Sequence, residues 1–155
     1  MRKVAIDANL LLLLVVGKAS KSFIAEHKRL SAFTGADFDM LRSIIVRANS
    51  VLITPNVATE VSNLLGYGVR EPMRSRIFAV FRELVPKMLE HYEASQLAIG
   101  QPEFDQLGLS DCAWLGALDP ETVLLTADLP LYLAAIKRGF KAENVNHLRE
   151  RQQMT

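Results

Sequence analysis

Short hydrophobic runs alternate with stretches of helical periodicity along the chain. Buried strands are expected at residues 3–6, 51–54 and 123–126, with a short last strand within 140–148. An apolar helix or turn is expected from residue 10, and helices over 22–33, 37–48, 55–65, 71–86, 102–107, 110–118 and 130–138. Residues 87–100 fit either a short strand or a continued helix, and 149–155 form a polar tail. We therefore predict one α/β domain over residues 1–148, a three-layer α/β/α sandwich around a mainly parallel sheet of four to five strands.

Several helix boundaries have local signals. Thr54-Pro55 places a hydroxyl at the N-cap and a proline at the first helical position. Asp37 and Ser110 are also suitable N-caps, and Gly139 is a stop signal after the helix at 130–138. These signals indicate where the polar residues near each strand end should lie.

The apolar run from Leu10 to Val16 follows Met1-Arg2-Lys3 and imitates a signal peptide. Asp7 and Asn9 interrupt its apolar stretch, and it is shorter than the roughly 20 apolar residues that span a bilayer. We therefore expect a core segment of a cytoplasmic protein that does not contact the membrane. The single cysteine, Cys112, excludes an intrachain disulfide and a cysteine-based zinc site, which fits a reducing compartment.

The 155 residues are 50% hydrophobic and 23% charged, as expected of an ordered globular domain. Because the formal net charge is only +1, a general nucleic-acid coat is excluded and any phosphate contact must be local. The basic residues that could make such contacts fall in two groups, which are Arg70, Arg74, Arg76 and Arg82, and Lys137, Arg138 and Lys141.

Four acids are expected at one edge of the sheet. Asp7 and Asp128 follow strands, whereas Glu60 and Asp111 lie in the first turns of helices. In a parallel sheet the carboxyl ends of strands and the amino ends of the following helices share one edge. Each acid alone also fits an ordinary role as a cap, dipole partner or turn residue. Together they would repel one another unless a hard cation such as Mg²⁺ or Mn²⁺ joined them, and such a cation can activate water against a phosphodiester.

The order of these motifs resembles the PIN domain, a metal-dependent ribonuclease fold found in many bacterial and archaeal toxin proteins. The matching segments are residues 6–9 (Ile-Asp-Ala-Asn), Thr54-Pro55 leading to Glu60, residues 107–111 (Leu-Gly-Leu-Ser-Asp), residues 125–131 and residues 134–140. They span nearly the whole chain. The arm before Val51 and the stretch 66–100 are longer than the family pattern requires.

The resemblance implies a metal-dependent endoribonuclease whose products carry a 5′-phosphate. It implies that Asp7, Glu60, Asp111 and Asp128 bind Mg²⁺ or Mn²⁺ and act in catalysis, that Thr126 is a supporting hydroxyl, and that Asn9 orients Asp7 or a metal water. It further implies a homodimer and a role as the toxin of a toxin–antitoxin pair, silenced by an antitoxin that inserts a peptide near the acids.

Other functions stay open from the sequence. A catalytically silent RNA-binding or scaffold protein of the same fold and a DNA-directed nuclease both fit the pattern. A receiver-like phosphoacceptor domain fits poorly, because Thr54-Pro55 stands where its phosphoacceptor aspartate is expected. The three histidines lack metal-ligand spacing and are interpreted as surface or packing residues (His27, His91 and His147), and Cys112 as a buried structural thiol.

Overall fold

A computed structural model describes residues 2–154. Its sheet contains β1 (Lys3–Ile6), β2 (Ser50–Ile53), β3 (Leu89–Glu90), β4 (Thr122–Thr126) and β5 (Lys141–Asn144). The strands are all parallel and their order is β3-β2-β1-β4-β5. Val4 of the central strand pairs with Val51 on one side and Val123 on the other. This register brings the carboxyl ends of β1, β2 and β4 to the same edge.

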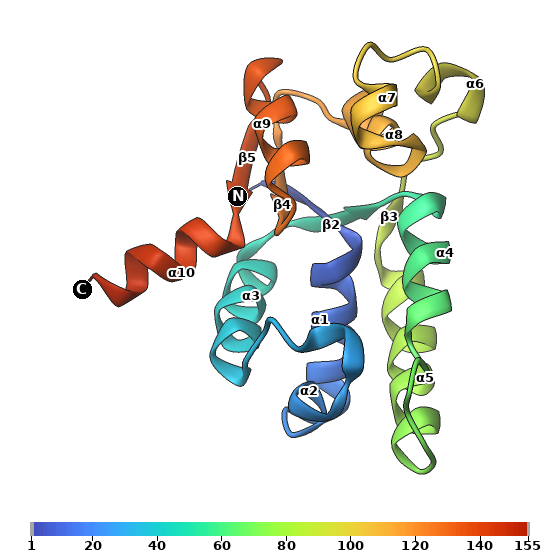
Figure 1. The fold of residues 1–155 in the computed structure, drawn as a ribbon, viewed down its shortest axis with the longest axis vertical. Helices are drawn as coiled ribbons and strands as arrows, with labels where there is room; N and C mark the ends of the chain where they lie inside the picture. The colour runs from blue at the N-terminus through green and yellow to red at the C-terminus, as the bar shows by residue number, and fades with distance from the viewer. Residues whose placement is uncertain (1, 155) are drawn as a thin grey trace.

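Helices cover both faces of the sheet (Figure 1). One layer holds α1 (Ala8–Ala19), α2 (Phe23–Glu26), α3 (Gly35–Arg47), α4 (Pro55–Leu64) and α5 (Met73–Leu84). The other holds α6 (Ser95–Ala98), α7 (Phe104–Leu107), α8 (Leu109–Ala117) and α9 (Leu129–Lys137). The last helix, α10 (Val145–Gln153), extends away from the layers, and short 3₁₀ turns lie at Lys28–Leu30 and Val85–Lys87. The predicted three-layer α/β/α fold is confirmed.

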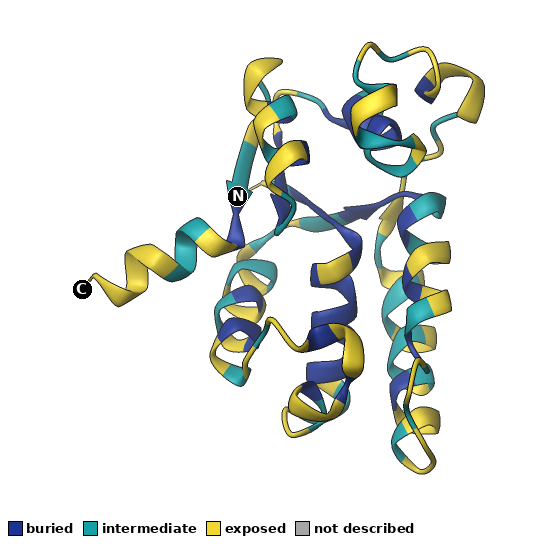
Figure 2. Ribbon diagram, viewed as in Figure 1, coloured by how far each residue is buried: buried dark blue, intermediate teal, exposed yellow. Residues whose placement is uncertain are grey.

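The apolar run near the N-terminus forms α1, the most buried helix of the structure (Figure 2). It is apolar on all sides because α2, α3, α4 and α5 surround it. Residues 10–16 are all buried and belong to the main hydrophobic core. Within residues 2–154, no helix combines the length and the apolar character needed to cross a membrane.

Several local predictions are confirmed. The Thr54 hydroxyl accepts a hydrogen bond from the Val57 backbone N–H at 3.1 Å, and α4 begins at Pro55. Gly139, at a φ of 85°, follows the end of α9. The uncertain stretch 87–100 holds both a strand, β3, and the short helix α6.

Other boundaries were predicted wrongly. Residues 22–33 do not form one helix, because His27 is extended and its ring bonds to the Leu65 carbonyl at 3.0 Å. Helix α3 is capped by Thr34 and not by Asp37, whose carboxylate instead accepts from the Thr34 backbone N–H. Helix α8 begins at Leu109, so Ser110 lies inside the helix and is not its N-cap.

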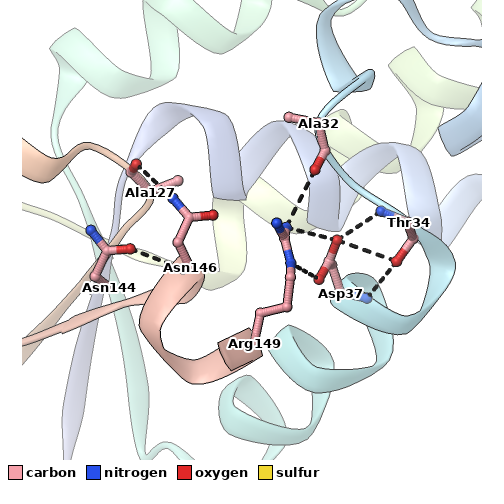
Figure 3. Close-up of polar contacts among 7 residues, drawn as sticks. All are labelled: Ala32, Thr34, Asp37, Ala127, Asn144, Asn146 and Arg149. Atoms are coloured by element: carbon pink, nitrogen blue, oxygen red, sulfur yellow. Dashed lines mark hydrogen bonds and ion pairs between the residues drawn. The ribbon is translucent and has the colours of Figure 1, made fainter. Parts of the chain in front are cut away.

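Residues 149–153, which the sequence left in a polar tail, complete α10. Arg149 donates two 2.9 Å hydrogen bonds to the buried Asp37 carboxylate and one of 3.3 Å to the Ala32 carbonyl (Figure 3). Asn146 donates to the Ala127 carbonyl at 3.4 Å. These contacts join α10 to α3 and to the segment that follows β4.

Candidate active site at the carboxyl edge of the sheet

Asp7 is the most buried of the four predicted acids, with 6% of its surface exposed. It caps α1, because its Oδ1 accepts a 2.9 Å hydrogen bond from the Ala8 backbone N–H. Its own backbone N–H bonds to the Leu125 carbonyl of β4 at 3.1 Å. The carboxylate is therefore fixed between the end of the central strand and the start of the central helix.

Thr126 links two of the acids. Its hydroxyl donates to Asp7 Oδ2 at 2.9 Å and accepts from the Asp128 backbone N–H, also at 2.9 Å. The threonine is fully buried at the end of β4, and its bond to Asp7 is shielded from water, whereas the bond from Asp128 is partly exposed. One hydroxyl thus sets the position of Asp128 relative to Asp7, and the supporting role that the family resemblance implies for Thr126 stays a prediction.

The remaining acids lie around this pair. Asp128 caps α9 through a 3.0 Å bond from the Leu131 N–H to its Oδ1. Asp111 is the third residue of α8 and is half-buried, whereas Glu60 lies midway along α4 and is exposed. The structure therefore brings the four acids to one edge from four separate segments.

The electrostatics of the edge show that these carboxylates influence one another. Burial, then Asp7, Asp128 and Glu60, raise the pKa of Asp111 to about 7. Burial also raises the pKa of Asp7, against the lowering effect of its hydrogen bonds. Partial burial and Asp7 raise the pKa of Glu60, although its side chain stays open to solvent, which screens the effect. Every charged neighbour that shifts these three pKa values is an acid, so within residues 2–154 no basic side chain neutralises the edge.

Two buried polar atoms without an ordinary hydrogen bond within residues 2–154 lie on α8 beside these acids, Trp114 Nε1 and Ser110 Oγ. The indole N–H of Trp114 faces Asp7 and lowers the pKa of that carboxyl, so Asp7 is its partner although the contact is longer or more bent than an ordinary hydrogen bond. Buried polar groups rarely stay unpaired in proteins. The Ser110 hydroxyl is therefore available for a further hydrogen bond beside the acids.

The donor set fits a hard divalent cation. It offers only oxygen ligands and excess negative charge, which Mg²⁺ and Mn²⁺ prefer. Within residues 2–154, no three His, Cys, Asp or Glu side chains stand as a ready ligand set. Both Asp7 oxygens and one Asp128 oxygen already accept internal hydrogen bonds, which leaves fewer free lone pairs for a metal. Mg²⁺ usually keeps several waters and needs only one or two carboxylates, so a complete set of protein ligands is not required.

The other candidates have different places. Asn9 is exposed and, in the described chain, makes no hydrogen bond to Asp7, so its expected role of orienting Asp7 or a metal water stays a prediction for the metal water alone. His27 is a buried packing residue, His91 pairs with Glu93 at 3.3 Å, and His147 packs edge-on against Tyr132. Cys112 is buried, as predicted, and burial raises the pKa of its thiol.

Sequence reasoning missed a cleft beside the acids. It has a volume of about 520 Å³ and is lined by Glu60 together with Asn56, Thr59 and Asn63 of α4, Tyr92 and Glu93 after β3, and Ser110 of α8. Tyr92 is 75% exposed. Glu93 folds back against Gly116 of α8, where a side chain in place of the glycine hydrogen would collide with its carboxylate. Because β3 is only two residues long, no hydrophobic pattern signals that Tyr92 and Glu93 follow a strand.

No family model matches the chain, and no curated protein matches it. Among solved structures, it is similar to a domain of a functionally unknown protein from Methanocaldococcus jannaschii DSM 2661, with a TM-score of 0.44 and 18% sequence identity. The similarity covers 93% of this chain and 91% of that chain. A likeness at this level carries no argument about function.

Proposed function

We propose that the protein is a Mg²⁺- or Mn²⁺-dependent endoribonuclease whose active site is the acid edge formed by Asp7, Glu60, Asp111 and Asp128. One observation carries the proposal: four carboxylates, one of them buried, converge without a basic partner. An uncompensated buried charge costs several kcal/mol by rough estimate, so structural roles alone explain it poorly. The Ser110 hydroxyl, which is without a hydrogen-bond partner within residues 2–154 and lines the cleft beside Glu60, supports a polar ligand here.

One or two of the four acids would bind the cation directly and the others through its waters, and Thr126 and the Ala8 N–H would keep Asp7 in place. When bound, such a cation supplies Lewis acidity toward the phosphodiester and lowers the pKa of water. Water would add to phosphorus while the bond to the 3′-oxygen breaks, and the 3′-oxygen takes up the proton that the water releases, which leaves a 3′-hydroxyl and a 5′-phosphate.

The cleft beside the acids supports RNA as the substrate. Tyr92 presents an exposed ring on which an unpaired base can stack, and the Asn56 and Asn63 amides offer donors and acceptors for base edges. The resemblance to PIN-domain toxins is the basis for the biological part of the proposal. We infer a cytoplasmic toxin that forms a homodimer and is silenced by an antitoxin protein.

The decisive experiment is cleavage of structured RNA, single-stranded RNA and DNA with Mg²⁺, Mn²⁺ or EDTA. Wild type should cut RNA only with metal, and Asp7→Asn and Asp111→Asn should abolish cleavage while the proteins stay folded. Asp105→Asn is the matched control, because it removes the same charge from an exposed position on α7. Full activity in folded Asp111→Asn would overturn the assignment.

The same samples distinguish the proposed ribonuclease from two alternatives. If metal raises the melting temperature but no RNA is cut, even after denaturation and refolding to remove a bound inhibitor, a catalytically silent RNA-binding protein is favoured. Preferential cutting of DNA would instead keep the mechanism and change the substrate class.

A further inference from the structure

A turn at the far end of α4 gathers cations that have no acidic partner. Gly66–Gly68 follows the helix, and Lys28, Arg29, Arg70 and Arg74 lie on or beside it; we call these four residues and Tyr67 the basic turn. None of the four cations forms an ion pair within residues 2–154. Glu71, the adjacent acid in sequence, is hydrogen-bonded to Ser75 instead.

Contacts across the turn order these cations. The Arg29 guanidinium lies 4.7 Å from the centre of the Tyr67 ring. Arg74 donates to the Gly66 carbonyl at 3.3 Å and lies 4.7 Å from the centre of the Phe78 ring. The Lys28 side chain covers Gly68 and leaves no room for a Cβ there, and the positive φ of 71° at Gly68 also disfavours any residue other than glycine. Stacked guanidinium groups are well suited to phosphate oxygens, since less side-chain freedom is lost on binding.

Three other arginines differ from this group, whereas Arg42, Arg47, Arg76 and Arg82 likewise form no ion pair within residues 2–154 but do not surround the turn at Gly66–Gly68. Arg138, Arg149 and Arg151 each pair with an acid, Glu103, Asp37 and Glu143 respectively. Paired arginines have their charge balanced within the protein. The cations of the basic turn are therefore available to an anionic ligand.

Helix α4 connects the basic turn with the acid edge. Asn56, Glu60 and Asn63 line the cleft and are spaced by three or four residues, which places them on one face of the helix. Tyr67 follows four residues after Asn63, and the bond from its N–H to the Leu64 carbonyl continues the turn. At 1.5 Å per residue, Asn56 and Leu64 are separated by roughly 12 Å along the helix, and Tyr67 lies three residues beyond its end.

We propose that a single strand of RNA runs along α4, with its scissile phosphate at the acid edge and flanking phosphates bound by the basic turn. This deepens the proposed function and rests on it. Glu60 and Glu93 line the cleft and repel phosphates, so the bases of the RNA face Tyr92 and the asparagines there. The flanking phosphates bind the positive charges of Arg29, Arg70 and Arg74. A substrate long enough to reach the basic turn gains affinity that a shorter one lacks.

The test is fluorescence anisotropy of labelled single-stranded RNA in EDTA, with Asp7→Asn protein so that nothing is cut. Oligonucleotides of about 4 and about 20 nucleotides are compared, which brackets short and long binding sites. The double variant Arg70→Gln/Arg74→Gln is set against Arg42→Gln/Arg47→Gln, which removes two exposed charges from α3.

For the long RNA, Arg70→Gln/Arg74→Gln should weaken binding roughly tenfold and reduce the slope of log affinity against log salt by about 1.4. The α3 double variant and the short RNA should show little change. Equal losses in both double variants, or equal losses for both RNA lengths, would overturn the inference. Single-stranded DNA and polyglutamate serve as competitors, and displacement by polyglutamate as readily as by RNA would also overturn it.

The two proposals fail in different ways. Metal-dependent cleavage of short RNA together with unchanged long-RNA binding in the basic-turn variant would refute the track along α4 and leave the nuclease standing. Binding of long RNA that depends on Arg70 and Arg74, in a wild type that never cuts, would support the track and refute the nuclease. Arg29→Gln is a second variant with the same expected direction if the double variant unfolds.

Discussion

The acid edge and the basic turn both hold like charges without an opposite partner, but their energetic situations differ. At the acid edge Asp7 is buried and Asp111 half-buried, so loss of water raises their pKa values. At the basic turn all four cations are exposed and keep their hydration. Exposed charges at a protein surface interact weakly, whereas buried ones are costly. A cation bound as we propose would therefore stabilise the acid edge, whereas the basic turn needs no ligand to be stable.

Helix α10 contains a third kind of charged region, in which opposite charges are paired. On α10, Arg149 has 31% of its side chain exposed and pairs with Asp37, whose side chain is 5% exposed. Here opposite charges satisfy each other across 112 positions of sequence. Variants in the three regions should consequently affect different properties. Variants of the acid edge should change cleavage and metal affinity, variants of the basic turn should change RNA affinity, and variants of the Arg149–Asp37 pair should change stability.

The largest effect on the acid edge short of losing an acid is expected from Thr126→Val. The change keeps the shape of the side chain but removes the donor to Asp7 and the acceptor for the Asp128 N–H. Loss of a partner that orients a metal ligand commonly costs roughly 10- to 100-fold in activity or metal affinity. Cleavage rate and Mn²⁺ affinity, each measured on folded protein, check this.

Thr122→Val is the matched control, because Thr122 is a buried threonine on the same strand that donates to Asp119 at 2.8 Å. It should lower stability without changing cleavage. Thr126→Ser should retain most of the activity, since it keeps the hydroxyl. Equal cleavage rates for Thr126→Val and wild type would show that the Thr126 hydroxyl is not needed for the function of the acid edge.

Arg149→Ala should have the largest effect on stability. It leaves the buried Asp37 carboxylate with only its contacts to Thr34 and frees α10 from α3. Breaking a buried pair costs about 3–5 kcal/mol, and the partial exposure of Arg149 reduces the expected loss to about 2 kcal/mol. Urea unfolding measures it. Arg151→Ala, which removes a pair exposed on both sides, should change the free energy of unfolding by less than about 0.5 kcal/mol.

The acid edge also predicts how stability depends on pH. Between 3.8, the ordinary pKa of an aspartate, and about 7, the folded chain holds a proton on Asp111 that the unfolded chain has released. The free energy of unfolding therefore falls as pH rises through this window. A cation favours the deprotonated carboxylates, so Mn²⁺ should raise the melting temperature more at about pH 8 than at about pH 6, by a few degrees.

Thermal unfolding with and without Mn²⁺ at both pH values provides the measurement. Asp111→Asn should flatten the metal-free pH dependence. The acids whose pKa is lowered, Asp119 to about 2 and Glu103, lose their contribution as pH falls below about 5, so the effect of Asp111 is measured between about pH 5 and 7. Identical Mn²⁺ shifts at both pH values would mean that the metal does not bind at the acid edge.

The sequence predicted the features that local chemistry determines. Strands β1, β2 and β4 follow from apolar runs, and the Thr54-Pro55 start of α4 follows from capping rules that need no distant partner. With parallel strands, these elements were enough to place the four acids on one edge.

Features that depend on distant partners could not be predicted. The break at His27 comes from a bond to Leu65, 38 positions away, and the Arg149–Asp37 pair closes only after the sheet has formed. The cleft at Tyr92 depends on a two-residue strand, and the basic turn on the packing of residues 28 and 29 against residues 66–68. Local patterns carry no record of such contacts.

Of the variants considered, Arg70→Gln in the basic turn should change the free energy of unfolding least, and this distinguishes the basic turn from the acid edge. Arg70→Gln removes an exposed, unpaired charge, so the free energy of unfolding should change by less than about 0.5 kcal/mol, in either direction. Urea unfolding, run beside the RNA-binding assay, checks both properties on one sample. A loss of about 1 kcal/mol or more would show that the basic turn stabilises the fold, and any fall in RNA affinity could then follow from altered structure. An unchanged unfolding curve with weaker binding of long RNA would assign these cations to the ligand.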